Sequence, residues 1–282
     1  MKVSGETSNW PRHRISGMNI PERHWREYAI DGLCLGLFML SATMFATLLQ
    51  HPSSPLSGWM TAPIVQRIPM GVAMGLTAAA IIYSPLGRRS GAHMNPALTL
   101  TFLRLGKVTP VDALGYIAAQ FAGGAAGIVA AVWLLRGLPA DPSVNFIATM
   151  PGPEGSAVAF LAESVISFGM MLMVLTATNT SRLAPFTGLF AGALVATYIT
   201  FEAPLSGMSM NPARSLGPSV LAHQGASLWI YFVAPTVGML AAAEVFVRTR
   251  GRESVGCAKL HHPQHGRCVF GCRASQEERV RP

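Results

Sequence analysis

The sequence is short of charged residues. Only 12% of its 282 residues are Asp, Glu, Lys or Arg, whereas about a quarter of an ordinary soluble domain is charged. Half of the residues are hydrophobic and the mean hydropathy is +0.38, which excludes that class. The net charge of +8 could suggest a nucleic-acid partner. Membrane topology explains the positive charge better, because Lys and Arg gather in tails and short loops around uncharged apolar segments. We therefore expect no nucleic-acid partner.

Cysteine and catalytic motifs are also scarce. Of four cysteines, Cys34 lies in an apolar segment and three follow residue 256, which excludes a secreted disulfide framework. The first 26 residues are polar and rich in Arg and Pro, so we expect no cleavable signal peptide. Nothing resembles a nucleophile with its base, a phosphate-binding loop or a metalloprotease helix. We therefore expect no enzyme, and no cofactor in the apolar part of the chain.

What the sequence has instead is long apolar segments. Each is close to the length of about 20 residues that a helix needs to cross a bilayer. They predict an all-α membrane protein with six transmembrane helices, at about residues 28–49, 68–86, 113–135, 158–178, 183–201 and 228–247.

One motif occurs twice between these segments. Ser-Gly-Ala-His-Met-Asn-Pro-Ala at residues 90–97 returns as Ser-Gly-Met-Ser-Met-Asn-Pro-Ala-Arg at residues 206–214. Asn favours the helix N-cap and Pro the first helical position, but the apolar runs that follow are too short to span a bilayer. The irregular Ser-Gly turns are tolerated in a membrane only where protein or a watery cavity covers them. Two re-entrant half-helices are therefore predicted to begin at Asn95, Pro96 and Ala97 and at Asn211, Pro212 and Ala213.

The chain divides into two repeats. Each has three spanning segments with a half-helix between its second and third, at about residues 27–136 and 157–247. Three is an odd number, so the repeats are inverted and their half-helices meet tip to tip at mid-membrane, the usual place of a permeation site. Residues 27–247 form the predicted channel domain, with an N-terminal arm at 1–26 and a basic tail at 248–282.

Lys and Arg predict the orientation. Six spans can place five positive segments on one side, and the opposite loops hold only Arg67 and Arg136. The positive-inside rule then puts both termini in the cytoplasm of a protein integral to the plasma or inner cell membrane, with the lipid bilayer as a partner. The five segments are the arm, 88–89, 104–107, Arg182 and the tail.

The paired Asn-Pro-Ala motifs, the second followed by Arg214, resemble those of the aquaporin (major intrinsic protein) family. The resemblance covers roughly residues 27–247 and implies a homotetramer with one pore per subunit. The two Asn amides at converging positive helix ends would orient a passing water and repel cations. We expect a passive, proton-excluding channel for water, with other small neutral solutes left open. The alternatives are a glycerol or small-solute facilitator with little water preference and, from a different class, a coupled secondary transporter.

The resemblance also implies a selectivity filter. Arg214 is the family's constriction residue, and offsets from the second motif add Met208 and Ile199. The position in the second span falls on Met74 or Gly75.

Other positions bear on the solute. Strict water channels have a His where this chain has Ile199, which suggests a wider filter. Ser215 follows the second motif where glycerol-conducting relatives usually have Asp, and the pair Tyr231-Phe232 resembles that of water channels.

Ionisable residues also lie inside the apolar part. Asp31 and Glu163 occupy equivalent places in the two repeats, and an intramembrane acid is by default a functional hypothesis. We favour a structural role in which each accepts backbone N–H bonds from the re-entrant loop of its own repeat. Family members usually have Glu at both of these positions, so Asp31 departs from the family pattern and has a shorter side chain. His93 is expected to be a structural histidine.

The tail carries a cluster that the resemblance does not reach. Its Cys and His residues fall within 16 positions, and such spacings suggest a tetrahedral zinc site. The alternative is that they are incidental, or reactive cysteines. The residues are Cys257, His261, His262, His265, Cys268 and Cys272.

Overall fold

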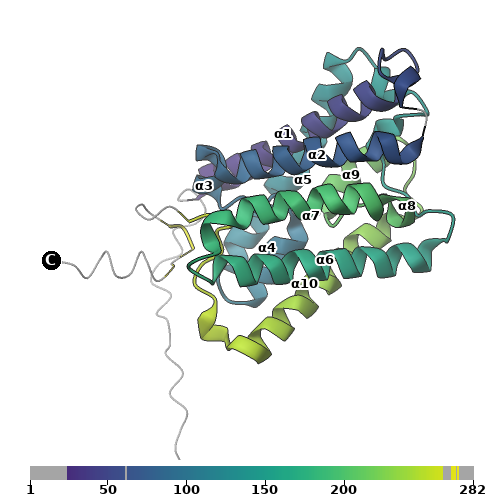
Figure 1. Ribbon diagram of the computed structural model, residues 1–282. Coiled ribbons are helices and arrows are strands. Elements are labelled where there is room, and N and C mark those ends of the chain that lie inside the picture. Colours follow the sequence, from purple (N-terminus) through teal and green to yellow (C-terminus); the bar gives the residue numbers. More distant parts are fainter. Residues whose placement is uncertain (1–23, 61, 263–267, 271, 273–282) are drawn as a thin grey trace, which may run out of the picture.

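The computed structural model describes residues 24–60, 62–262, 268–270 and 272. These residues form helices and loops and contain no strand, and six of the helices are long and apolar enough to cross a membrane (Figure 1). The predicted all-α fold is confirmed. The six are α1 (Trp25–Gln50), α2 (Pro63–Tyr83), α5 (Pro110–Leu134), α6 (Ser156–Thr178), α7 (Thr187–Phe201) with the turn η4 (Ala184–Phe186) before it, and α10 (Leu228–Arg250).

The predicted boundaries need small corrections. The second span begins at Pro63 and ends at Tyr83 rather than covering 68–86, because Ser84 accepts a bond from the Gly87 backbone N–H (3.1 Å) and caps a new helix. Pro85, at its first position, has no N–H with which to continue α2. α1 begins at Trp25, and α10 runs three residues past 247.

Four short helices complete the bundle, α3 (Pro85–Ser90), α4 (Pro96–Arg104), α8 (Ala203–Ser206) and α9 (Pro212–Leu221). α4 and α9 are the two half-helices, and both begin at a capped Asn-Pro. α4 ends at Arg104, and Gly106 follows its C-cap residue Leu105. The positive φ of Gly106, 73°, lets the Lys107 N–H bond back to the Phe102 carbonyl (2.9 Å) in the manner of a glycine C-cap. The 3-10 turns are η1 (Ser57–Trp59), η2 (Leu138–Ala140), η3 (Asn145–Ile147) and η5 (Arg252–Ser254).

The helices pair as an inverted repeat requires. α1 packs along α5 and α6 along α10, and α2 and α7 join the two repeats. Glycines make these approaches close: a Cβ on Gly32 would meet the Ala119 carbonyl, and one on Gly192 would meet the Gly75 carbonyl. Small residues serve helix contact in this way in membranes.

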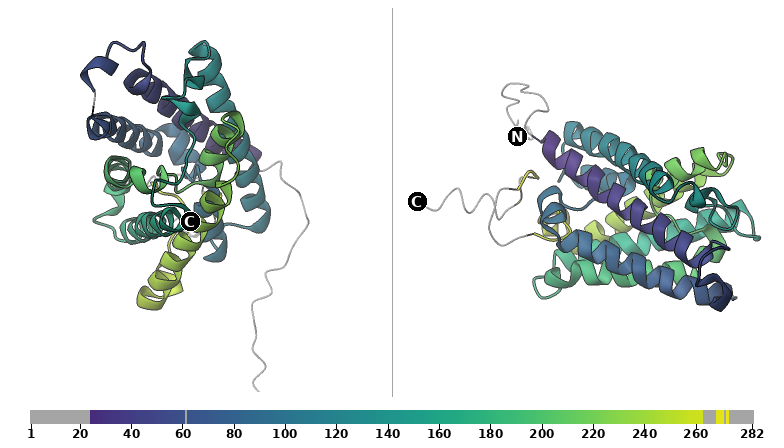
Figure 2. Two further views of the ribbon diagram at one scale, coloured as in Figure 1. Left: turned by 90° about the vertical axis from the view of Figure 1, so that its right-hand side faces the viewer. Right: turned by 90° about the horizontal axis from the view of Figure 1, so that it is seen from above.

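The bundle has two distinct ends (Figures 1 and 2). We call the end with α3 and residues 251–262 the tail end, and the end with α8 and residues 137–155 the loop end. α3 and α8 each precede a half-helix, so α4 and α9 start from loops at opposite ends and meet in the middle (Figure 1).

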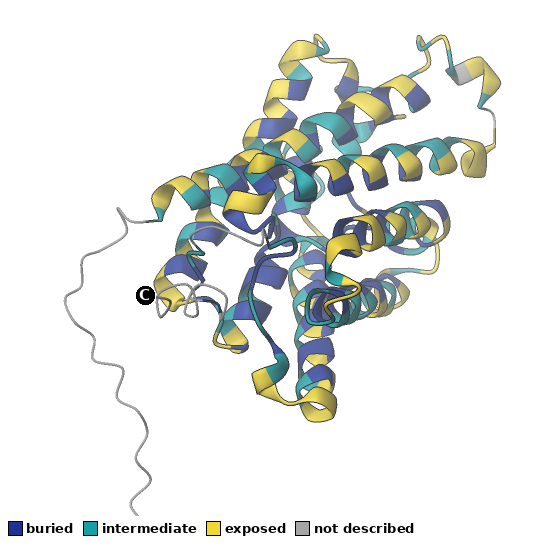
Figure 3. Cartoon of the chain, turned by 60° about the vertical axis from the view of Figure 1, so that its left-hand side comes forward, coloured by how far each residue is buried: buried dark blue, intermediate teal, exposed yellow. Residues whose placement is uncertain are grey.

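The outward faces of the spanning helices are apolar and exposed, and buried residues face inward (Figure 3). Large exposed apolar surfaces mark contact with lipid or protein rather than water. Exposed leucines occur on five spanning helices, at Leu33 (51%), Leu76 (64%), Leu114 (71%), Leu161 (64%) and Leu189 (53%).

Candidate functional site

The tips of the two half-helices are joined by a reciprocal pair of hydrogen bonds. Asn95 Nδ2 donates to the Met210 carbonyl and Asn211 Nδ2 donates to the Met94 carbonyl, both at 2.7 Å. The amide oxygens cap the helices, since Asn95 Oδ1 accepts from the Ala97 N–H (2.9 Å) and Asn211 Oδ1 from the N–H groups of Ala213 and Arg214. Each amide thus caps its own helix and binds the opposite loop.

Asp31 and Glu163 hold these loops from behind. Asp31 accepts from the backbone N–H groups of His93 (2.9 Å) and Met94 (2.8 Å). Glu163 accepts from those of Ser209 and Met210, both at 2.7 Å. Both acids are 0% exposed. The shorter Asp31 makes the same pair of backbone contacts as Glu163, and it gains a bond from Gln120 Nε2 (2.7 Å).

A second symmetric pair was missed by the sequence analysis. Tyr116 donates its hydroxyl to the Ser90 carbonyl and Tyr231 donates to the Ser206 carbonyl, each at 2.6 Å. Sequence position gives a signal only in retrospect, because each Tyr lies near the start of the helix that follows its half-helix, as the seventh residue of α5 and the fourth residue of α10.

The loops themselves have unusual backbone conformations. Ala92, Met94, Met208 and Met210 have φ between 50° and 56°, a left-handed region that non-glycine residues seldom adopt. Such conformations persist where surrounding contacts over-determine them, and here the buried acids and tyrosines supply those contacts.

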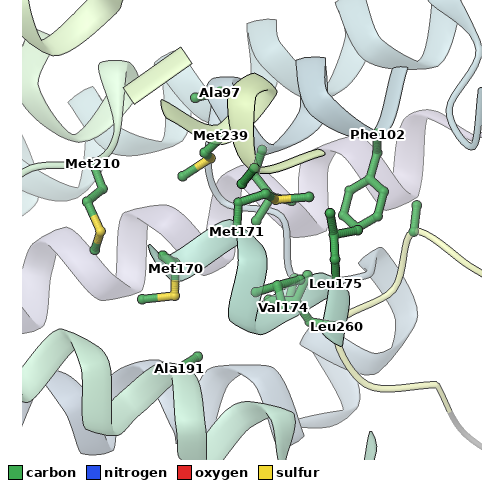
Figure 4. Close-up of a cluster of buried hydrophobic side chains, with 14 of the residues drawn as sticks. Ala97, Phe102, Met170, Met171, Val174, Leu175, Ala191, Met210, Met239 and Leu260 are labelled. Carbon is green, nitrogen blue, oxygen red and sulfur yellow. The ribbon is translucent and has the colours of Figure 1, made fainter. Parts of the chain in front are cut away.

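A cavity of about 480 Å³ passes the half-helix tips. Its lining runs from Ile82 and Leu260 at the tail end, past Asn95 and Asn211, to Arg67 at the loop end. Methionines are prominent in the wall; Figure 4 shows three of them, from α6, from the loop before α9 and from α10. The lining methionines are Met70, Met74, Met94, Met170, Met208, Met210 and Met239.

Four of the five residues suggested for the filter line this cavity: Arg214, Met208, Ile199 and Met74. Of the two alternatives in α2, Met74 lines the cavity and Gly75 does not. Gly75 faces α7, where a Cβ would meet the Gly192 carbonyl. The rotation of α2 that brings the glycine against α7 turns Met74 to the cavity.

Two polar groups at the loop end were not foreseen. The Ile147 carbonyl accepts a bond from Arg214 Nη1 (3.1 Å) and fixes the guanidinium. Arg67, counted from sequence only as a loop charge, lines the same cavity. Sequence spacing could not show the first contact, because 67 residues separate the partners.

The described part of the tail folds against the tail end of the bundle. Sγ of Cys257, Cys268 and Cys272 and a ring nitrogen of His262 all lie within 4.8 Å of one another. His261, which the sequence analysis included, is not in this group: its ring packs on Tyr83 (centroids 5.0 Å apart), because neighbouring residues point to different sides of the chain. His265 lies outside the described residues.

Charge and burial affect the tail side chains. Burial, followed by the charge of Arg88, lowers the pKa of His261. A hydrogen bond from Cys257, with a further one from His262, lowers the pKa of Cys268.

These features define a class, the integral multi-pass membrane proteins with an inverted helical repeat and two half-helices. The chain belongs to the family described as Major intrinsic protein, whose profile matches residues 25–246.

Relatives agree with this assignment. The chain is 36% identical to Aquaporin NIP2-3 of Zea mays over 69% of its own length, and 38% identical to Aquaporin NIP3-1 of Zea mays over 64%. The matches span 63% and 59% of the lengths of these relatives. The X-ray structure of the aquaglyceroporin from Plasmodium falciparum has the same fold, with a TM-score of 0.65 at 20% identity over 78% of this chain and 94% of that one.

Proposed function

We propose that the protein is a passive channel that conducts water and excludes protons. The observation that carries this proposal is the junction of Asn95 and Asn211 at the wall of one cavity that extends from the tail end to the loop end. The NIP relatives are named aquaporins, which supports the same function here.

The junction provides the mechanism. An Asn amide has two N–H groups, and each Asn uses one on the opposite loop. The second of each pair is available to the oxygen of a passing water, whose hydrogens then point away from the junction. Such a water cannot relay a proton, and the two positive helix ends repel cations. The methionine side chains in the cavity wall offer the water few other hydrogen-bond partners that would compete with the two amides.

A coupled transporter needs titratable groups that meet the transport path. Asp31 and Glu163 are fully buried, bonded to the loops and absent from the cavity lining. Their geometry supports structural roles. His93 is titratable and does line the cavity, but both of its ring nitrogens are engaged, by the Thr99 hydroxyl (3.1 Å) and the Ala258 carbonyl (2.8 Å). This arrangement favours a passive channel over a transporter.

A second candidate function is facilitation of glycerol-sized neutral solutes. Met74, Met208 and Ile199 give the loop end an apolar wall, and Arg214 with the Ile147 carbonyl gives it a polar side. That combination suits a small molecule that has both hydroxyl groups and apolar C–H groups.

We further propose that the tail end faces the cytoplasm, in a plasma or inner cell membrane, because Arg88, Arg89 and Arg104 lie there and cytoplasmic loops carry an excess of Lys and Arg. The family resemblance supports a homotetramer, in which some of the exposed apolar faces would contact neighbouring subunits.

A matched pair of tryptophan variants tests the channel. Ile199→Trp fills the cavity, whereas Leu189→Trp lies on the exposed face of the same helix. In stopped-flow osmotic measurements on proteoliposomes we expect Ile199→Trp to lower water permeability at least about tenfold, equivalent to roughly 1.4 kcal/mol, and Leu189→Trp to leave it unchanged. The same vesicles challenged with glycerol and urea rank the solutes. Permeability equal to that of protein-free vesicles, or unaffected by Ile199→Trp, would refute the proposal.

A further inference from the structure

The cysteine and histidine cluster of the tail has the composition of a metal site. Cys257 Sγ and Cys268 Sγ are 3.5 Å apart, and His262 Nε2 is 3.1 Å from Cys272 Sγ. A separation of 3.5 Å is far beyond the roughly 2.05 Å of a disulfide bond. The four groups come from residues spaced five, six and four apart along the chain, so the backbone has to fold back on itself to bring them together.

The distances suit a tetrahedral ion. Zinc bound at about 2.3 Å to sulfur and about 2.0 Å to nitrogen holds its ligand atoms roughly 3.5–3.8 Å apart, and three Cys with one His is a structural zinc set. All four ligand atoms already lie within 4.8 Å of one another. Small side-chain rotations would seat the ion, and soft thiolates favour zinc over Mg²⁺ or Ca²⁺.

The same segment is bound to the loop of the first half-helix. The Ala258 carbonyl accepts from His93 Nε2 (2.8 Å), and the Leu260 N–H donates to the Gly91 carbonyl (3.1 Å). The ring of Phe270 stacks on the imidazole of His93 at 5.2 Å and 8°. The two tail residues that contact His93, Ala258 and Phe270, lie on opposite sides of Cys268 in the chain. The cysteine and histidine cluster and the tail residues that contact the half-helix loop therefore form one unit.

Leu260 connects this unit to the cavity. It is 5% exposed, lines the cavity at the tail end and belongs to the same apolar cluster as Val174 and Leu175 of α6 (Figure 4). Lys259 adds an anchor, with Nζ on the Arg88 carbonyl (2.8 Å). A tail held in this position narrows the tail end of the cavity.

We propose that Cys257, His262, Cys268 and Cys272 bind one Zn²⁺, and that the ion fastens the tail over the tail end of the cavity with Leu260 as the plug. Binding of the metal to the folded tail alone stabilises the docked arrangement, since a ligand that prefers one state shifts the population toward it.

Metal content tests the site without any measurement of flux. The full chain, reduced, loaded with zinc and desalted, should carry one zinc per chain by elemental analysis. Cys34→Ser and His261→Gln, outside the cluster, should keep it, and Cys268→Ser/Cys272→Ser should lose it. Cobalt substitution of the wild type should give the spectrum of a tetrahedral thiolate complex. A wild-type chain without bound zinc, or a double variant that retains it, would end the proposal.

The plug is tested by water permeability and rests on the proposed function. Protein reconstituted after metal removal should conduct at least about threefold more water than zinc-loaded protein, a shift expected when the open population rises. Cys268→Ser/Cys272→Ser should be insensitive to zinc, and Leu260→Ala should conduct more even with zinc bound. Equal permeability of zinc-loaded and stripped wild type would overturn the plug. If neither form exceeds protein-free vesicles, the channel function fails, and the zinc content still decides the site.

Discussion

Replacement of Glu163 by Leu is expected to collapse the second half-helix loop and abolish conduction. The change leaves the Ser209 and Met210 N–H groups, both now bonded to the carboxylate at 2.7 Å, without an acceptor inside the bundle. Each buried unsatisfied group costs about 1–3 kcal/mol. Thermal unfolding in detergent should therefore shift down by roughly 5–20 °C for a domain of this size, and water permeability should fall to the level of protein-free vesicles.

Two controls separate the buried bonds from the loss of a charge. Glu163→Gln keeps one acceptor oxygen and should lie between wild type and Glu163→Leu in both measurements. Glu154→Leu removes an exposed acid from the loop before the same helix and should change neither. A Glu163→Leu protein with wild-type unfolding temperature and permeability would show that the acid does not hold the loop.

Removal of the Arg214 side chain is expected to change selectivity. The guanidinium lines the cavity and is fixed by the Ile147 carbonyl (3.1 Å), so Arg214→Ala widens the loop end and deletes a positive charge there. A barrier lower by about 1.4 kcal/mol raises a rate tenfold, and we expect glycerol flux relative to water to rise by roughly that factor. Stopped-flow swelling with glycerol and with an impermeant osmolyte measures the ratio.

Arg136→Ala is the matched control for Arg214→Ala. Arg136 follows α5 near the same loop end but is not part of the cavity lining, so its loss should leave the ratio unchanged. An unaltered ratio in Arg214→Ala would place the filter elsewhere along the cavity.

The sequence predicts those parts of the fold that local chemistry determines. Asn and Pro specify the start of a helix within a few residues, so both half-helices were predictable at Asn95 and Asn211. The length of the apolar segments then predicted the spans. The error at the end of α2 had a local cause as well, because Ser84 and Pro85 together start a new helix.

Rotation of helices and direction of side chains were not predictable. Met74 and Gly75 are neighbours, and only the packing of α2 on α7 decides which of them faces the cavity. Likewise His261 packs on Tyr83 while His262 joins the cysteines. Contacts between distant residues, such as that of Arg214 with the Ile147 carbonyl, leave no pattern in a single sequence.

If the junction of Asn95 and Asn211 passes water and stops protons, water flux and proton flux through the same proteoliposomes must differ. Proteoliposomes with an internal pH indicator are given an osmotic gradient in one experiment and a pH gradient, with a potassium ionophore to prevent charge build-up, in the other. We expect water permeability well above that of protein-free vesicles and a rate of pH decay equal to theirs. A pH gradient that collapses faster in the presence of the protein would contradict this expectation.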